Sequence, residues 1–218
     1  MRVGDHDPSF DEAGDMLREF AISHHETVLW FDLGGDTEGQ PGRQGAADPV
    51  DAVTMADIGR LVVIAARPQP DDVPILLNAA PRSAFTSVPA RARLEEWEAR
   101  SSLDRAATEL YNCFRRKGIG QAKRSKLLHL KRPWLVPIYD THVTKVYQRR
   151  ARSLRAEVGS LAAAWWEASK RDLIDGAPEF SRLAADLAAD PDPAVRRVSK
   201  LTPLRLLDIL AWSLDGKR

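Results

Sequence analysis

The spacing of apolar side chains along this chain follows the period of an α-helix almost throughout. Close to the N-terminus, Ser9 can cap a helix with one apolar face, made by Phe10, Ala13, Leu17, Phe20 and Ala21. Near the C-terminus, Thr202 as a cap and Pro203 at the first helical position open another helix. In all, the pattern predicts a helix from Thr54 that Pro68 and Pro70 end, a short one near 73–77, and others over 102–116, 121–130, 141–155, 161–174, 178–189 and 203–214.

Two segments interrupt this helical pattern. The run Thr-Val-Leu-Trp-Phe over 27–31 is rich in β-branched and aromatic residues and predicts one strand or an extended loop. Residues 33–50 are rich in Gly, Asp, Gln and Pro, which is typical of a flexible surface loop. We therefore expect a mostly α fold, with an N-terminal helix and loop over 1–50 and a helical domain over 51–218.

Charge is distributed very unevenly along the chain. The formal net charge is +1, yet 111–155 holds thirteen of the 32 Lys and Arg residues and only one of the 31 acids, Asp140. That segment is therefore +12 and the remainder −11. One basic stretch in an otherwise acidic chain predicts a localised site for a polyanion, although a merely solvated basic helix face is the alternative.

Several classes of protein are disfavoured. The N-terminus is polar and lacks the apolar stretch of a signal peptide, and no apolar run approaches the roughly 20 residues of a membrane span. Cys113 is the only cysteine, so the chain can form no internal disulfide and cannot ligate an iron–sulfur cluster through cysteines. His24 and His25 have no second ligand pair at a metal-binding spacing. We expect a monomer in the reducing cytoplasm, without a metal cofactor.

The most informative turn is Lys117-Gly118-Ile119-Gly120, between two predicted helices. Glycines at both ends of the turn permit unusual backbone conformations and let a phosphate approach the amides at the start of the next helix. Basic residues flank the turn. The sequence thus predicts a helical hairpin that binds DNA backbone without reading sequence, through Lys117, Gly118, Ile119, Gly120, Lys123, Arg124 and Lys126.

Twenty residues after Gly120, Asp140 stands in the segment Pro-Ile-Tyr-Asp-Thr-His-Val over 137–143, which leads into another helix. Endonuclease III-like glycosylases of the helix-hairpin-helix superfamily carry a Gly-Val-Gly hairpin, a helix, a proline-containing loop and Val-Asp-Thr-His-Val at this spacing. The chain resembles them at 118–120 and 140–143. A second resemblance, over most of 50–215, is to a family of bacterial proteins of unknown function.

The glycosylase resemblance implies a two-lobed helical fold with the hairpin at 102–130 and the catalytic loop and helix at 137–155. It implies that Asp140 is catalytic, facing the sugar of a nucleotide flipped out of double-stranded DNA. It also leaves room for a structural monovalent cation at the hairpin. Tyr139, His142 and Trp30 are candidates for the base pocket, and Trp165, Trp166, Phe31 and Trp212 are further possible walls.

The chain departs from the glycosylase pattern at three places. Arg116-Lys117 replaces the usual Leu-Pro, and Arg124 replaces a small alanine. Ala122 stands where members with lyase activity have a lysine, and Lys123 is one helical step, about 100°, away. The resemblance therefore implies a monofunctional glycosylase that leaves an abasic site, in DNA repair or in defence against phage DNA with modified bases.

Two other interpretations remain open. The chain can be a non-catalytic helix-hairpin-helix DNA-binding protein in which Asp140 only caps a helix, a frequent role of aspartate. A hydrolase acting on RNA or on nucleotides fits the hairpin less well, since the hairpin suits duplex backbone.

Overall fold

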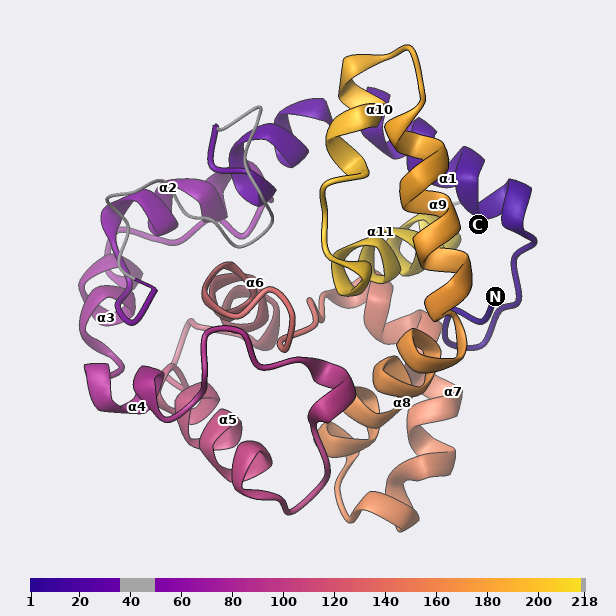
Figure 1. The fold of residues 1–218 in the computed structure, drawn as a ribbon. Helices are drawn as coiled ribbons and strands as arrows, with labels where there is room; N and C mark the ends of the chain where they lie inside the picture. Colours follow the sequence, from indigo (N-terminus) through magenta and orange to yellow (C-terminus); the bar gives the residue numbers. More distant parts are fainter. Residues whose placement is uncertain (36–49, 217–218) are drawn as a thin grey trace.

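The structure, a computed structural model, describes residues 1–35 and 50–216, and among them it contains helices and no named strand (Figure 1). The predicted mostly α class is confirmed. The helices are α1 (Phe10–Ser23), α2 (Met55–Val63), α3 (Asp72–Asn78), α4 (Arg82–Thr86), α5 (Ser102–Cys113), α6 (Gln121–Lys131), α7 (Thr141–Val158), α8 (Leu161–Asp175), α9 (Ala177–Ala188), α10 (Pro193–Val198) and α11 (Pro203–Gly216), with a π-helix η1 (Thr27–Asp32) and a 3-10 turn η2 (Leu94–Glu96).

Caps account for most of the helix starts. Ser9 and Thr54 each form a capping box. The cap side chain accepts from the third helical amide, and the acidic side chain at that third position accepts from the cap residue's own amide. Ser101 accepts from the Asp104 amide and so opens α5. α2 ends at Val63, before Pro68, and Ala65 and Arg67 follow with positive φ angles.

The segment 27–31 is neither a strand nor an extended loop, so that prediction was wrong. It lies in the π-helix η1, where Val28 and Phe31 turn toward the core at helical spacing. Arg60 of α2 fixes it by donating from Nε to the Phe31 carbonyl at 2.9 Å. Burial and this tertiary contact outweigh the weak β propensity of the residues. The predicted loop over 33–50 lies mostly outside the described residues.

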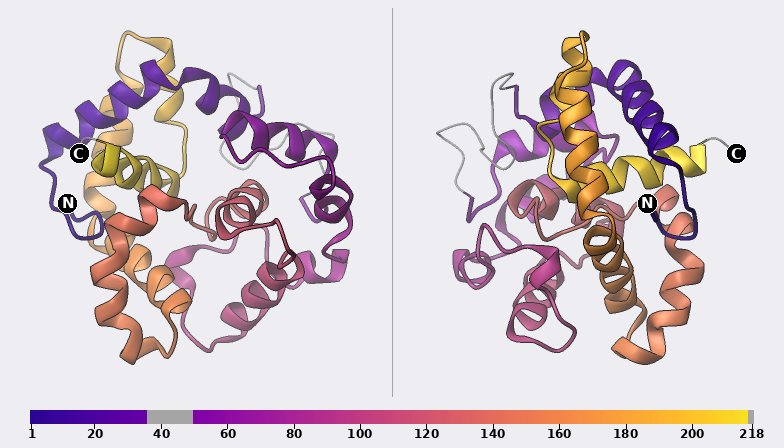
Figure 2. Two further views of the ribbon diagram at one scale, coloured as in Figure 1. Left: turned by 180° about the vertical axis from the view of Figure 1, so that it is seen from behind. Right: turned by 45° about the vertical axis from the view of Figure 1, so that its right-hand side comes forward.

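Helix α6 runs through the middle of the molecule, and the other helices surround it (Figures 1 and 2). Helices α2 to α5 lie on one side of it, and α7 to α11 lie on the other together with α1. α7 packs against α8 and α11, while α1 packs against α9, α10 and α11. The N-terminal helix thus shares the core of the C-terminal helices. None of the described helices combines the length and apolar character that crossing a membrane requires.

Because α6 is enclosed, its polar side chains find partners inside the protein. Lys131 forms an ion pair with Asp57 of α2, and both side chains are fully buried. The Arg132 guanidinium donates to the carbonyls of Val88 at 2.8 Å and Phe85 at 2.6 Å and pairs with Asp51 at 2.8 Å. Part of the basic segment therefore holds the fold together and does not face solvent.

His129 provides a pH-dependent test of this packing. Burial lowers the pKa of His129 to about 3, so the ring is neutral and its Nδ1 donates to the Val136 carbonyl at 2.7 Å. Between pH 6.5 and 3 the unfolded chain binds a proton here that the folded chain does not, so stability falls as pH falls. His129→Gln keeps a donor and does not titrate. Urea unfolding at pH 7 and 5 should show the wild type losing about 2 kcal/mol more than this variant. Equal losses would mean that His129 is protonated in the folded state.

Candidate functional site

The hairpin between α5 and α6 has an exposed basic tip. Gly118 has φ +87°, which favours glycine, and the Ile119 amide donates back to the Arg116 carbonyl at 3.1 Å. Ile119 is buried and anchors the turn, whereas Arg116, Lys117 and Gly120 are exposed. Gly120 is the N-cap of α6 and offers no side-chain partner to the first amides of that helix. The tip therefore presents cations and helix-start amides together, as a phosphate site needs.

Lys123 does not share this exposed tip. Its ammonium lies 2.5 Å from Asp72 Oδ2 on α3 and also donates to the Gly118 carbonyl at 3.2 Å. The hydrogen bond from Lys123 holds the pKa of Asp72 below its usual range. Asp72 is so close that a Cβ on Gly118 would lie 3.2 Å from its Oδ1. Lys123 thus braces the inner side of the hairpin against α3.

The two other predicted phosphate contacts on α6 also point inward. The Arg124 guanidinium lies over the Tyr111 ring, 4.8 Å from its centre. Lys126 is buried, and its Nζ donates to the Ile64 carbonyl at 3.1 Å and lies 3.6 Å from Asp140 Oδ2. Burial lowers the pKa of Lys126. Lys117 and the glycines are the predicted hairpin residues that reach the surface.

Asp140 is the N-cap of α7. Its Oδ1 accepts from the amides of His142 at 3.0 Å and Val143 at 3.1 Å. Its Oδ2 makes the longer contact with Lys126 described above, and 17% of the side chain is exposed. One carboxylate oxygen thus fixes the helix start, and the other remains available beside a buried cation.

The loop that delivers Asp140 is tied to α6 and α11. Ser125 Oγ accepts from the Tyr139 amide at 3.0 Å, and His129 binds the Val136 carbonyl. Asp208 of α11 accepts from the Ile138 amide at 3.0 Å, and burial raises the pKa of this carboxyl well above its usual range. These bonds over 136–139 hold Asp140 in one position relative to α6.

A pocket of about 310 Å³ opens in front of Asp140. It lies between the starts of α6 and α7, and its lining includes Ala122, Thr144, Lys145 and Gln148. Ala122 therefore lines the same pocket as the carboxylate. Lys145 is the only cation among the lining residues, and it is paired with Asp215 at 3.1 Å.

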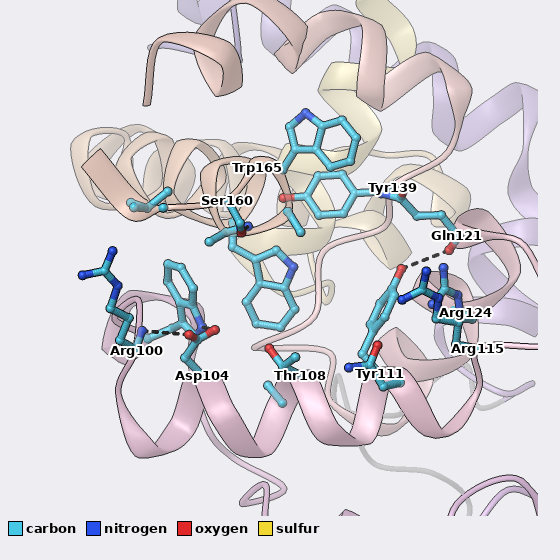
Figure 3. A pocket seen from close by; sticks show the side chains of 18 residues that line it. Arg100, Asp104, Thr108, Tyr111, Arg115, Gln121, Arg124, Tyr139, Ser160 and Trp165 are labelled. Atoms are coloured by element: carbon cyan, nitrogen blue, oxygen red, sulfur yellow. Dashed lines mark hydrogen bonds between the residues drawn. The ribbon is translucent and has the colours of Figure 1, made fainter. Parts of the chain in front are cut away.

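A larger cavity of about 560 Å³ adjoins this pocket and shares Gln121 and Tyr139 with it (Figure 3). The cavity lies between α5 and α8. Aromatic rings from Trp97, Tyr111, Tyr139, Trp165 and Trp166 form much of its walls. Arg115 and Arg124 lie at the end nearest the hairpin, and Arg100 lies at the other end (Figure 3). Tyr139 is buried, lies 5.7 Å ring to ring from Trp165 and bonds through its hydroxyl to Ser169 Oγ at 3.1 Å.

The structure separates the predicted base-pocket residues. Tyr139 lines both cavities, and Trp165 and Trp166 line the larger one. His142 lines neither: its Nδ1 lies 2.7 Å from Asp215 Oδ2, and its ring packs against Trp212. Trp30 is 52% exposed on η1 and also lines neither cavity.

Sequence reasoning missed the contribution of α5. Asp104, Thr108, Tyr111 and Arg115 recur at helical spacing and line the larger cavity along one side (Figure 3). The signal was a polar and aromatic stripe on the helix preceding the hairpin. Among the described residues, no group of three or more His, Cys, Asp or Glu side chains could hold a metal ion.

The chain is thus an all-helical protein, over its described part, with a basic hairpin beside a carboxylate pocket. It belongs to a family of unknown function, DUF6308, whose model matches residues 38–215. No curated protein and no solved structure matched the chain.

The contact between Lys126 and Asp140 can be tested through stability. Lys126→Met leaves the Ile64 carbonyl and one Asp140 oxygen without their cation, so it should lower the unfolding free energy by about 1–3 kcal/mol. Lys117→Met, at an exposed position, is the matched control and should change it by less than about 0.5 kcal/mol. Urea unfolding measures both. Equal changes in unfolding free energy for the two variants would show that the buried Lys126 ammonium does not stabilise the fold more than an exposed lysine does.

Proposed function

We propose that this protein is a monofunctional DNA glycosylase, which extrudes a damaged or modified base from double-stranded DNA and hydrolyses its N-glycosidic bond. The observation that carries the proposal is the position of Asp140. Asp140 lines a pocket near the exposed hairpin, and its Oδ1 accepts from two amides of α7. The carboxylate is therefore fixed in orientation before a substrate arrives.

The chemistry needs one such carboxylate. The bond between C1′ and the base nitrogen breaks, and its electron pair leaves with the base, so positive charge develops on the sugar. A water molecule then forms the new bond to C1′. Asp140 Oδ2 stabilises the positive charge and accepts the proton that this water loses. The departing base takes up a proton from solvent, and the products are the free base and an abasic site.

The one amine that lines the pocket, that of Lys145, is paired with Asp215 at 3.1 Å. A lyase needs a lysine that forms a Schiff base with C1′, but Ala122 occupies the corresponding position. Lys123 is paired with Asp72, and Lys126 contacts Asp140 but does not line the pocket. The expected product is therefore an intact strand with an abasic site.

Exposed cations lie on the hairpin that precedes α6 and along α7, the two helices whose first residues line the pocket. Arg116 and Lys117 lie at the hairpin, and Arg149, Arg152 and Arg155 are exposed along α7, which begins at Asp140. Phosphates on either side of an extruded nucleotide would meet both groups. The proposal includes a monomeric protein that acts in the cytoplasm, either on lesions or on the modified bases of foreign DNA.

A second candidate is a non-catalytic DNA-binding protein. It is favoured by the two hydrogen bonds through which Asp140 caps α7, because capping by itself explains an aspartate at this position.

Asp140→Asn separates the two candidates, since asparagine caps a helix about as well as aspartate but carries no charge. On duplexes with damaged or modified bases, this variant should lose excision by roughly 10²-fold or more while keeping DNA affinity. The measurement is strand breakage after alkali treatment. Asp192→Asn, at the cap of α10, is the matched control and should excise like wild type. Unchanged excision by Asp140→Asn would show that Asp140 is not a catalytic residue.

The hairpin makes a second prediction. Arg116→Ala with Lys117→Ala should weaken duplex binding for every sequence and reduce the slope of log affinity against log salt by about 0.9 for each lost phosphate contact. Fluorescence anisotropy over a salt series measures this slope. Arg182→Ala, an exposed cation on α9 that stacks on Phe10, is the control and should keep the wild-type slope. A loss that depends on DNA sequence would mean that the hairpin reads bases.

A further inference from the structure

The larger cavity is a built feature of the fold. α5 provides one wall, through Thr108 and Tyr111, and α8 provides the opposite wall, through Trp165 and Trp166 (Figure 3). Trp97 is almost fully buried, and its Nε1 donates to Asp104 Oδ1 at 3.1 Å, which fixes the end of the cavity away from the hairpin. Aromatic walls on two helices form a slot for a flat ring system.

The charged groups of the cavity are mostly donors. Arg100, Arg115 and Arg124 reach its lining, and guanidinium groups donate hydrogen bonds but accept none. Asp104, the acid in the lining, already accepts from Trp97 and from the Arg100 amide at 2.7 Å. Burial raises the pKa of Tyr111 to about 12, so its hydroxyl stays protonated and donates to the Gln121 carbonyl at 3.2 Å. The cavity therefore fits a ligand rich in acceptor oxygens.

The size of the cavity is the third observation. About 560 Å³ lies in the range that holds a drug-sized ligand, and a single DNA base is smaller than such ligands. The shared residues Gln121 and Tyr139 connect the cavity to the pocket in front of Asp140. A nucleotide with its sugar at Asp140 would direct its base past Tyr139 and leave much of the cavity unfilled.

Resting on the proposed function, we propose that the cavity receives an extruded base carrying a bulky, oxygen-rich substituent. The base stacks among the aromatic rings near Tyr139. The substituent extends between α5 and α8 and accepts hydrogen bonds from the arginines. Unsubstituted bases make none of these bonds, so the cavity selects substituted bases.

Binding tests the cavity without any turnover. Duplexes carry one central base: cytosine with a hexose-bearing arm at C5, adenine with a carboxymethyl arm at N6, or the unsubstituted parent of each. In the Asp140→Asn background at least one substituted duplex should bind 10-fold or more tighter than its parent. It should also quench tryptophan fluorescence, because three tryptophans line the cavity. Equal affinity and equal quenching for both pairs would overturn the proposal, even if excision occurs.

Two variants on α5 then locate the effect. Thr108→Phe adds bulk inside the cavity and should reduce the preference for the substituted duplex by 10-fold or more. Glu109→Phe adds the same bulk at an exposed neighbour outside the lining and should keep that preference. A preference that survives Thr108→Phe, in a variant whose circular dichroism shows it to be folded, would place the substituent elsewhere and overturn the assignment.

Excision by the wild-type protein distinguishes this proposal from the proposed function. Excision of substituted and parent bases at equal rates would overturn the cavity assignment and leave the glycosylase intact. No excision of any base, together with a 10-fold binding preference, would reject the glycosylase and support the cavity as a site for modified bases.

Discussion

The enclosure of α6 is the constraint on which the rest of the structure depends. The buried polar side chains of a helix surrounded by other helices are removed from water, so partners within the protein stabilise them. Ser125 and His129 meet this need by binding the loop that follows the helix, and Lys131 and Arg132 meet it by binding α2 and the loops near Phe85 and Val88. The same bonds therefore satisfy the core and position Asp140.

This arrangement connects the fold to the candidate chemistry. Asp140 is held from three directions, by the amides of α7, by the loop bonds to α6 and α11, and by Lys126 behind it. A carboxylate fixed in this way loses little freedom when a substrate binds, which is what electrostatic stabilisation of a developing positive charge requires. The neighbouring aromatic cavity shares Gln121 and Tyr139 with the pocket in front of Asp140.

The basic segment shows why charge along a sequence overstates charge on a surface. Lys123, Lys126, Lys131 and Arg132 belong to the thirteen cations of 111–155, yet each is paired or buried. The exposed cations of this segment are at the hairpin tip and along α7. The hairpin was predictable because glycine placement and helix periodicity are local. The exposure of its neighbours was not, because it depends on Asp72, which is 51 residues away from Lys123.

The amino-acid sequence predicts the helical class, most helix starts, the glycine turn and the cap position of Asp140, since periodicity, capping and turn geometry act between residues a few positions apart. It misassigned 27–31 because the contact from Arg60 that stabilises η1 comes from another helix. The folded structure was needed to show which cations face solvent, which aromatic rings enclose a cavity and how α5 contributes to it. Those properties depend on packing between distant segments, and local patterns do not specify that packing.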